Sequence, residues 1–399
     1  MKIEKLHKIF LENPCICRDN RAIQPNSLFF ALKGERFDAN DFAADALKEG
    51  CKYAVVDRKD VAINEKYILV DNVLETLQQL ANYHRKYCRT KILGITGTNG
   101  KTTTKEFINA VLTKKYNVIA TEGNLNNHIG VPLTLLRLTP ETEIGIVEMG
   151  ANHLNEIAEL CEIAEPDYGI ITNIGTAHIK GFGSVEGIFK TKTALYEAVA
   201  RKKGTIFVNA DDEMLFPKAS ELCQSIYSYG IEKGDVKGKL GNPSLLLQVA
   251  LDGATVQTQL FGIFNLQNML AAYAIGTYFD VPKGAILEAI SNYIPKNNRS
   301  QIHKTSKNLL ILDSYNANPT SMENSIRSFQ YVEGENKHLI LGDMLELGHL
   351  SEKSHQKIKD LLQKLNLEEN TWLVGQNFSK NKVGKFTYFE NTESVMEHL

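Results

Sequence analysis

The sequence predicts an α/β protein of three domains, the central one built on a doubly wound parallel sheet. Three observations predict this class. The chain has 399 residues, too many for one typical domain. Short apolar runs alternate with segments of helical spacing, as in parallel sheets covered by helices. A glycine-rich turn at residues 94–103 separates one such run from one such helix, which is typical of a phosphate-binding loop.

Composition excludes several classes of function. Hydrophobic residues make up 43% of the chain and charged residues 23%, which is typical of soluble globular proteins. The formal net charge is -2 and no basic block occurs, so neither nucleic acid nor an anionic membrane is an expected partner. No apolar run reaches the length of a membrane span, and residues 1–14 lack the apolar core of a signal peptide. Together with six scattered cysteines, these features predict a cytoplasmic protein with reduced thiols.

Residues 1–88 are expected to form a small α/β domain. Polar residues crowd its turns, among them Arg21, Lys33 and Gly34. The pattern fits two interpretations equally well. These turns are solvated loops, or they form a binding site for a diphosphate or a uridine. The expected strands are residues 27–32 and 53–56, and the expected helices are residues 42–47 and 73–87.

Residues 89–297 are expected to form the central, mainly parallel sheet, with helices on both faces. A linker is expected at residues 295–298, where proline, lysine and two asparagines follow one another. The expected parallel strands after the glycine-rich turn are residues 117–120, 144–148, 168–172 and 205–208, followed by antiparallel strands at 244–251 and 254–260 and by helices from Asn265 and Lys283.

The glycine-rich turn is predicted to hold a nucleoside triphosphate. Its backbone N–H groups and the following helix N-terminus favour phosphate oxygens, Lys101 adds a charge, and Thr102 is suited to hold Mg²⁺. The strict pattern would place its first glycine at position 95, which is Ile95 here, so this is a variant P-loop. The alternative is a turn that binds nothing. The predicted phosphate-binding residues are Gly97, Thr98, Asn99, Gly100, Lys101, Thr102 and Thr103.

Two side chains at expected strand ends are candidate metal ligands. Glu148 ends the apolar run at residues 144–148, at the sheet edge where ligands bind in open α/β folds. A helix-capping acid is the alternative. His178 follows the next strand and could reach a metal or a phosphate.

A lysine on an apolar helix face is the third candidate. Ile188, Phe189 and Leu195 mark one face of the helix that begins near Val185, and Lys192 falls on the same face. Lys190 lies off it. A buried lysine needs an anionic partner or a modified amine, whereas a snorkelling lysine needs neither, and the pattern leaves both open.

Several asparagines are candidate ligand contacts. Asn124, Asn126 and Asn127 lie in one loop that suits amide- and sugar-bearing substrates, although turn formation explains some of them. Asn265 and Asn268 lie one turn apart and off the apolar stripe of their helix, so they are expected to face a cleft or solvent.

Residues 298–399 are expected to form a third, doubly wound α/β domain. Polar residues follow its first two strands, in segments 313–319 and 342–348. The expected strands are residues 309–312, 338–341 and 371–374, with helices from Ser321 and Glu352 and a last helix that reaches Leu399.

Together these segments resemble the Mur ligases, the ATP-dependent enzymes that assemble the stem peptide of peptidoglycan. The resemblance covers nearly the whole chain. It rests on residues 96–102, on 148–151, and on 173–178 followed by 183–186 and Lys192. Segments 313–319 and 342–348 are similar to those of the branch that adds D-alanyl-D-alanine, and the Asp-Asn-Pro-Arg signature of the diaminopimelate-adding branch is absent.

The resemblance implies a function. The first domain would bind the UDP end of UDP-N-acetylmuramoyl-tripeptide, the central domain ATP, and the third would close over ATP and D-alanyl-D-alanine. A monomer is expected. Two Mg²⁺ ions would be held by Thr102, Glu148, His178 and a carbamylated Lys192, with Lys101, His178 and Lys192 as the catalytic residues. The resemblance places Asn265, Asn268, Arg299 and Asp313 at the nucleotide, and Asn316 and Asn318 at the dipeptide.

Two departures from the family pattern stand out. Asn20 replaces the serine usual between Asp19 and Arg21. Family members also usually continue past the equivalent of Leu399, so a third domain shorter than usual is expected.

Three other functions fit less of the sequence. The folylpolyglutamate synthases share the three-domain plan. A P-loop switch protein would need an Asn-Lys-x-Asp segment for guanine, which the chain lacks. An inactive UDP-sugar-binding protein is the third. Phosphate release measured with each candidate acceptor separates them.

Overall fold

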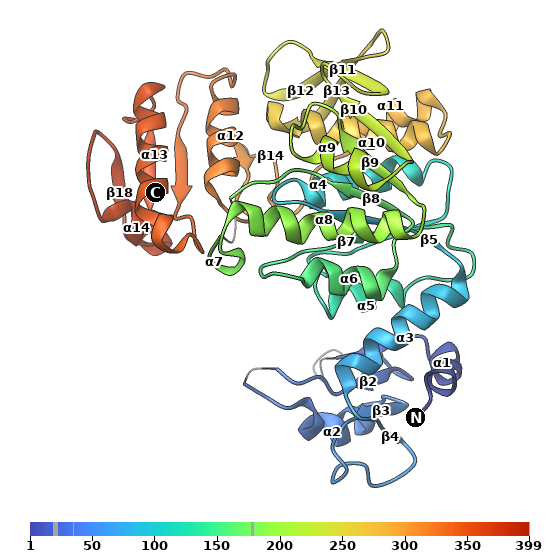
Figure 1. Ribbon diagram of the computed structural model, residues 1–399. Coiled ribbons are helices and arrows are strands. Elements are labelled where there is room, and N and C mark those ends of the chain that lie inside the picture. Colours follow the sequence, from blue (N-terminus) through green and yellow to red (C-terminus); the bar gives the residue numbers. More distant parts are fainter. Residues whose placement is uncertain (19–22, 35, 177–178, 399) are drawn as a thin grey trace.

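The computed structural model (Figure 1) describes residues 1–18, 23–34, 36–176 and 179–398. Three α/β bodies follow one another along the chain, each with its own sheet. The first body, blue in Figure 1, lies below the central one, and the third, orange to red, lies to its left. Arg21 and His178 lie outside the described residues.

The first body contains a four-stranded parallel sheet in the order β1-β2-β3-β4. The expected strand at residues 53–56 is confirmed, and that at 27–32 is shorter. Helix α1 was not predicted, although Leu6 and Phe10 lie four residues apart and are both buried. The elements are α1 Ile3–Glu12, β1 Ile16–Cys17, β2 Leu28–Phe30, η1 Ala39–Phe42, α2 Ala43–Lys48, β3 Tyr53–Val56, β4 Tyr67–Leu69 and α3 Val73–Cys88.

Helix α3 joins the first body to the second. Asn72 caps its start by accepting the N–H of Glu75 at 3.1 Å, and Arg89 ends it in the left-handed region at φ 56°. From α3, Arg85 Nη2 donates to Asp167 of the central body at 2.9 Å. One apolar core runs from α1 and α3 onto α5, α6 and α8, so the first body is docked firmly on the central one.

The central sheet has nine strands in the order β13-β12-β11-β10-β9-β8-β5-β7-β6. The strands β6, β7, β5, β8, β9, β10 and β11 pair parallel with their neighbours. The strands β12 and β13 pair antiparallel, as the sequence predicts. Asp252 and Gly253, both at positive φ, form the tight turn between the last two. The strands are β5 Lys91–Thr96, β6 Val118–Ala120, β7 Ile144–Glu148, β8 Tyr168–Ile171, β9 Thr205–Asn209, β10 Ile226–Gly230, β11 Val236–Leu240, β12 Leu246–Leu251 and β13 Ala254–Phe261.

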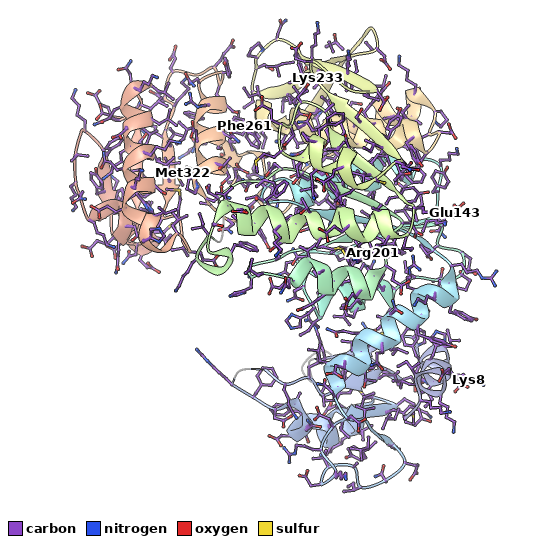
Figure 2. The ribbon with its side chains drawn as sticks, viewed as in Figure 1. Lys8, Glu143, Arg201, Lys233, Phe261 and Met322 are labelled. Atoms are coloured by element: carbon purple, nitrogen blue, oxygen red, sulfur yellow. The ribbon has the colours of Figure 1, made fainter. Side chains whose placement is uncertain are left out.

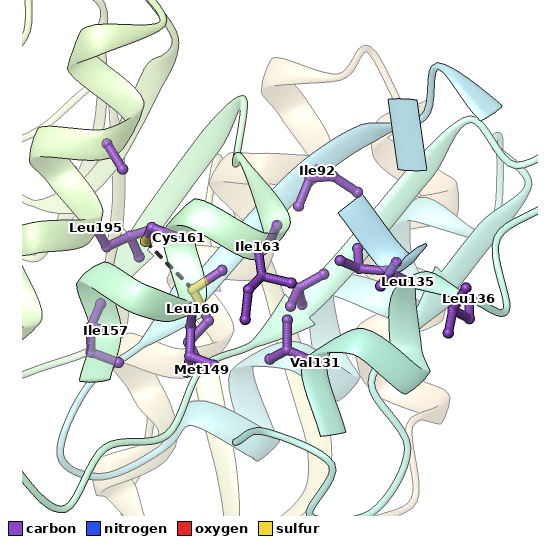
Figure 3. Packing of buried hydrophobic residues seen from close by; sticks show 14 of the residues in the cluster. Ile92, Val131, Leu135, Leu136, Met149, Ile157, Leu160, Cys161, Ile163 and Leu195 are labelled. Atoms are coloured by element: carbon purple, nitrogen blue, oxygen red, sulfur yellow. Dashed lines mark hydrogen bonds between the residues drawn. The ribbon is translucent and has the colours of Figure 1, made fainter. Parts of the chain in front are cut away.

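Helices cover both faces of this sheet (Figure 1). On one face α4, α10 and α11 pack together over a core that includes Phe107 and Met269. On the other, α5, α6 and α8 bury Val131, Leu160 and Leu195, which Figure 3 shows from close by. The helices are α4 Lys101–Leu112, α5 Gly130–Leu135, α6 Glu156–Ala164, α7 Ile179–Phe182, α8 Val185–Arg201, α9 Leu215–Leu222, η2 Ile263–Asn265, α10 Leu266–Tyr278 and α11 Lys283–Asn292.

The third body has a three-stranded parallel sheet in the order β16-β17-β18, with α12 and α13 packed against each other beside it. Its core includes Met322 of α12, labelled in Figure 2, and Leu362 of α13. The elements are β14 Gln301–Lys304, β15 Leu309–Leu312, α12 Pro319–Phe329, β16 Leu339–Gly342, η3 Gly348–Leu350, α13 Ser351–Lys364, β17 Thr371–Val374, α14 Gln376–Ser379, β18 Thr387–Phe389 and α15 Thr392–His398.

One strand of the third body pairs differently from the prediction. Residues 309–312 do form a strand, but β15 pairs antiparallel with β14 in a separate sheet of two strands and does not join the parallel sheet. The cause is the short turn before it, in which Thr305 and Asn308 hydrogen-bond through backbone and side chain. That turn folds the chain back as a hairpin, which the apolar run alone does not reveal.

No helix in the described ranges is both long enough and apolar enough to cross a membrane.

A buried histidine pair predicts an acid-sensitive first body. His7 Nε2 lies 3.0 Å from His84 Nδ1, and His84 Nε2 donates to the carbonyl of Leu138 at 2.8 Å. Burial, with His84 adding to it, lowers the pKa of His7 from 6.5 to about 4. The unfolded chain therefore binds a proton between pH 6.5 and 4 that the folded chain does not, so stability falls as the pH drops through that window.

His7→Gln tests this directly, because glutamine keeps a donor toward His84. Between pH 7.5 and pH 4, titration of His7 should cost the wild type up to about 3 kcal/mol of unfolding free energy. The His7→Gln variant should lack this loss. Urea denaturation at the two pH values measures this difference. Equal losses in both proteins would contradict the assignment.

Candidate active site

The glycine-rich turn joins β5 to α4 with two glycines at positive φ. Gly97 has φ 144°, and a Cβ there would lie 1.9 Å from Thr172 Oγ1. Gly100, the residue before α4, has φ 81°. Both positions thus require glycine, and Lys101 becomes the first residue of the helix. The backbone N–H groups at this helix start are available to an anion, which is the arrangement that a P-loop needs.

The end of β8 holds the P-loop in place. Asn173 accepts the N–H of Asn99 at 3.0 Å through Oδ1 and donates to the Asn99 carbonyl at 3.0 Å through Nδ2. Thr172 Oγ1 donates to the same carbonyl at 2.6 Å. The Gly175 N–H donates to Thr98 Oγ1 at 2.8 Å. The segment that follows β8 therefore helps to preorganise the loop.

Lys101 lies under the loop with its ammonium directed to backbone carbonyls. Its Nζ donates to the carbonyls of Gly97 at 2.8 Å and Thr98 at 3.1 Å. Burial lowers the pKa of Lys101, Glu148 opposes that shift and Arg299 adds to it. A cation in this position can move onto the phosphate of a bound nucleotide at little cost.

Glu148 ends β7 and faces the P-loop helix. The residue is 2% exposed, and its Oε1 accepts from Asn126 Nδ2 at 2.9 Å. Oε2 is buried and has no hydrogen-bond partner in the described part of the chain. A buried carboxylate oxygen without a donor is costly, so this atom fits a cation ligand. Thr102 lines the same cleft.

Lys192 is buried on α8, as the sequence indicates, and Lys190 is exposed. Lys192 is 3% exposed, and its Nζ lies 5.8 Å from the Phe182 ring centre. Among the described residues, no hydrogen bond or ion pair reaches this Nζ. Burial lowers the pKa of Lys192 well below its usual range, Lys101 adds to the shift and Glu156 opposes it.

A cleft of about 470 Å³ lies at the carboxyl edge of the central sheet and reaches the third body. It gathers most of the predicted site residues from segments far apart in the sequence. Lys192 is not among the residues that line it. The predicted residues that line the cleft are Thr98, Asn99, Gly100, Lys101, Thr102, Thr103, Asn124, Asn126, Asn127, Glu148, Asn265, Asn268, Arg299, Asp313, Asn316 and Asn318.

Two asparagines of the central body connect the P-loop helix with the third body. Thr104 Oγ1 donates to Asn268 Oδ1 at 3.1 Å, and Asn268 Nδ2 donates to Asn265 Oδ1 at 2.9 Å. Asn265 Nδ2 donates to Ser300 Oγ at 3.0 Å, and the Ser300 N–H donates to Asp313 Oδ1 at 3.0 Å. Both asparagines line the cleft, as predicted, but they are almost fully buried.

Arg299 and Asp313 form the third-body wall of the cleft. The Arg299 guanidinium stacks 3.7 Å from the centre of the Tyr315 ring, and its Nε is buried without a hydrogen-bond partner in the described ranges. Burial raises the pKa of the Asp313 carboxyl, partly offset by the Ser300 N–H. A stacked guanidinium with an unused donor is suited to an anionic ligand.

The two described candidates of the first body lie away from this cleft. Lys33 Nζ pairs with Asp57 at 3.0 Å, and the N–H of Gly34 donates to the Phe37 carbonyl at 3.0 Å. The structure therefore places Lys33 beside an acid at the edge of the first sheet. Whether it also binds a diphosphate stays a prediction.

Among the site residues that the sequence analysis did not name as ligand contacts, three matter most. Asn173, which holds the P-loop, directly follows a predicted strand and opens the segment 173–178 that supports the resemblance. Tyr315 lies within the polar segment 313–319 that follows a predicted strand, but the contact of its ring with Arg299 was not predictable. Glu156 lines the cleft and accepts the N–H groups of Asn152 at 2.6 Å and His153 at 2.9 Å. No pattern marked it.

These features define the class of the protein: a three-body P-loop enzyme whose cleft gathers cationic, amide and carboxylate groups around a phosphate cradle. Comparison with family models agrees. Residues 15–85 match the Mur ligase family catalytic domain, 95–276 the Mur ligase middle domain, and 298–382 the glutamate ligase domain.

Curated relatives and solved structures agree as well. UDP-N-acetylmuramoyl-tripeptide--D-alanyl-D-alanine ligase of Bacillus subtilis is 37% identical over 86% of this chain and 76% of its own length. The enzyme of the same name from Escherichia coli is 33% identical over 86% and 77%. MurF from Acinetobacter baumannii gives a TM-score of 0.85 at 32% identity over 96% of this chain and 85% of its own. MurF ligase from Thermotoga maritima, solved with ADP, gives 0.86 at 26% identity over 97% and 91%.

The chain belongs to the Mur ligase family.

Proposed function

We propose that this protein is an ATP-dependent ligase that joins D-alanyl-D-alanine to UDP-N-acetylmuramoyl-tripeptide in peptidoglycan precursor synthesis. The observation that carries the proposal is the cleft, in which the P-loop, the unpartnered Oε2 of Glu148 and the wall made by Arg299 and Asp313 face one space. ATP is the nucleotide that this enzyme uses, in keeping with the ADP complex of the Thermotoga maritima relative.

The reaction divides into two steps that the site is suited to. A carboxylate of the tripeptide attacks the γ-phosphate of ATP, ADP leaves, and an acyl phosphate forms. The amine of the dipeptide then attacks the acyl carbon, phosphate leaves, and the amide is made. Because both reactants of the first step are anions, Lys101 and Arg299 are placed to reduce their repulsion. The domain that closes over the cleft excludes water from the acyl phosphate.

Mg²⁺ is the expected metal, held by Thr102 and Glu148, with a second ion at His178 and Lys192. When bound, it supplies positive charge to the transferring phosphoryl group. The support is the buried, unpartnered Oε2 of Glu148. Within the described ranges, no cluster of three or more His, Cys, Asp or Glu side chains forms a ready metal site. The nucleotide phosphates, His178 and a modified Lys192 are the proposed remaining ligands.

Carbamylation of Lys192 is proposed to supply that anion. Burial lowers the pKa of the Lys192 amine, which raises the fraction of its neutral form, and a neutral amine can attack CO₂ and lose a proton to give a carbamate. The carbamate would replace a buried amine that has no described partner by an anion, which the positive charge of Lys101 would favour. Carbamylation therefore makes the burial of this side chain favourable when a cation is present.

The remaining assignments follow the same plan. We propose that residues 1–88 bind the UDP end through Arg21, Lys33 and Gly34, that 89–297 bind ATP, and that 298–399 close over ATP and the dipeptide. Asn265, Asn268, Arg299 and Asp313 would contact the nucleotide, Asn124, Asn126 and Asn127 the muramoyl substrate, and Asn316 and Asn318 the dipeptide. A cytoplasmic monomer is the proposed state.

Acceptor-dependent turnover tests this function. With ATP alone, ADP formation is expected to be slow, and it should rise by more than about 100-fold when both UDP-N-acetylmuramoyl-tripeptide and D-alanyl-D-alanine are present, because the acyl phosphate is protected from water. Mass spectrometry of the product should show the added dipeptide. Fast ATP hydrolysis without acceptors would favour a switch protein, and glutamate addition to a folate would favour a folylpolyglutamate synthase.

A further inference from the structure

A pair of asparagines connects the P-loop with the third body. Asn318 Nδ2 donates to Asn99 Oδ1 at 2.7 Å, and Asn99 Nδ2 approaches Asn318 Oδ1 at 3.4 Å. The two residues are 219 positions apart, and both line the cleft. A Cβ at Gly175 would lie 3.0 Å from Thr98 and 3.7 Å from Thr320 Oγ1, so the third body is close to the P-loop here.

The Asn318 amide has two separate tasks. Its Oδ1 accepts the N–H of Ser321 at 3.0 Å, and Ser321 Oγ accepts the N–H of Asn318 at 3.0 Å, which together form a capping box at the start of α12. The cap uses the oxygen and leaves the NH₂ group to reach Asn99. A serine or an aspartate at position 318 could keep the cap, but neither has that donor.

Asn99 is well suited to transmit the contact. Its backbone N–H and carbonyl are held by Asn173 and Thr172, so only its side chain is left to reach the third body. Lys101 Nζ binds the carbonyls of Gly97 and Thr98, directly before Asn99 in the same loop. Because the Asn99 backbone is fixed, its side chain offers the third body a firm docking point on the loop that cradles phosphate.

We propose that Asn99 and Asn318 form an interdomain latch that couples docking of the third body to the conformation of the P-loop. This rests on the proposed function, in which the third body completes the nucleotide site with Arg299 and Asp313. Asn318 is then a positioning residue that acts through Asn99, and this role replaces the dipeptide contact proposed for it above, which is left to Asn316. The latch helps hold the third body against the cleft, where its arginine faces the nucleotide.

Substitution at Asn318 separates the latch from the cap. Asn318→Ser retains a capping oxygen and loses the latch, whereas Asn318→Ala loses both. Titration calorimetry with Mg²⁺ and a non-hydrolysable ATP analogue should give about tenfold weaker binding for both variants, the size of one lost hydrogen bond to a well-aligned partner. Only the alanine variant should melt earlier. Full analogue affinity in the serine variant would leave the cap as the sole role of Asn318 and overturn the latch.

A double-mutant cycle identifies the partner. Asn99→Ala removes the other half of the latch and leaves the backbone contacts of residue 99 in place. The double variant Asn99→Ala/Asn318→Ser should bind the analogue about as weakly as either single variant, because the same bond is lost once. A loss that multiplies to about 100-fold would overturn the coupling.

Steady-state kinetics separates the latch from a dipeptide contact. In Asn318→Ser, the latch predicts a higher KM for ATP and a lower kcat, with KM for D-alanyl-D-alanine unchanged. A rise confined to the dipeptide KM would assign Asn318 to that substrate and overturn the latch. The calorimetry measures nucleotide binding and requires no ligation, so it tests the latch separately from the proposed function. A wild-type protein that fails to make the ligated product would refute the proposed function, and the latch could still be measured.

Discussion

Lys192→Ala is expected to abolish ligation, with a loss of more than about 100-fold in kcat, while the fold and nucleotide binding persist. Lys192 is 3% exposed, and no hydrogen bond or ion pair from another described residue reaches its Nζ. A buried ammonium without a partner is costly, so the described residues give no reason for burying this charged end. Lys192→Ala leaves a small cavity but also removes that cost, so we expect the melting temperature to change by only a few degrees.

The matched control for this prediction lies two residues away. Lys190 is on the same helix but exposed, so Lys190→Ala should leave kcat within about twofold. Short carboxylic acids or bicarbonate should partly restore Lys192→Ala, because a small anion can enter the space that the side chain vacates. Intact-protein mass spectrometry at high CO₂ should find an added carboxyl group on the wild type that the variant lacks. Near-normal turnover in Lys192→Ala would contradict the assignment.

Strands with unambiguous boundaries were predictable residue by residue. The predicted bounds of β3, β7, β15 and β17 agree with the structure, because each is a short apolar run between polar or turn-forming residues. Elements of weaker pattern were missed, among them α5, α6, β10 and β11. Helix α5 carries Pro132, and β11 alternates Val236 with lysines and a glycine, so neither matches a simple period.

Pairing between strands was harder to predict than their existence. The run at residues 309–312 is as apolar as a core strand, yet its first two side chains, Leu309 and Leu310, are exposed. Its antiparallel partner begins at Gln301 and has little apolar content, so no periodic signal announced the hairpin. Partner choice depends on tertiary packing, which one segment does not encode alone.

For the site, residue types were predictable and contacts were not. The P-loop, the position of Glu148 at a strand end and that of Lys192 on the apolar face of its helix follow from local patterns, whereas the burial of Lys192 was left open against snorkelling. The hydrogen bond from Asn126 to Glu148 and the latch between Asn99 and Asn318 join residues 22 and 219 positions apart. The first contact depends on how neighbouring strand ends of the central sheet meet and the second on how two bodies dock, and neither arrangement is visible in a local sequence pattern.

Glu148→Gln should lower kcat by more than about 100-fold without unfolding the protein. Glutamine is nearly isosteric and keeps an oxygen that can accept from Asn126 Nδ2, which now lies 2.9 Å from Glu148 Oε1. What is lost is the negative charge on an atom that is buried and unpartnered, Oε2. In the described part of the chain this atom receives no hydrogen bond, although its charge favours the ammonium of Lys101, so a bound cation is the ligand that it fits.

The melting temperature of Glu148→Gln distinguishes a structural role of the Glu148 charge from a metal-binding role. Without metal, a buried carboxylate oxygen that lacks a donor destabilises the fold, so Glu148→Gln should melt at the same temperature as the wild type or higher. A ligand that binds only the native state raises the melting temperature, so Mg²⁺ with ADP should raise that of the wild type. The rise should be much smaller in Glu148→Gln, because the metal has lost a ligand.

The control for Glu148→Gln lies at the opposite end of the same strand. Glu143, directly before β7, is exposed and lies on the edge of the central body away from the third one (Figure 2). Glu143→Gln makes the same chemical change far from the P-loop, so kcat and the response to Mg²⁺ with ADP should stay at wild-type values. If Glu148→Gln instead kept kcat within about tenfold and still responded fully to Mg²⁺ with ADP, the carboxylate would not be a metal ligand, and its burial would need another cause.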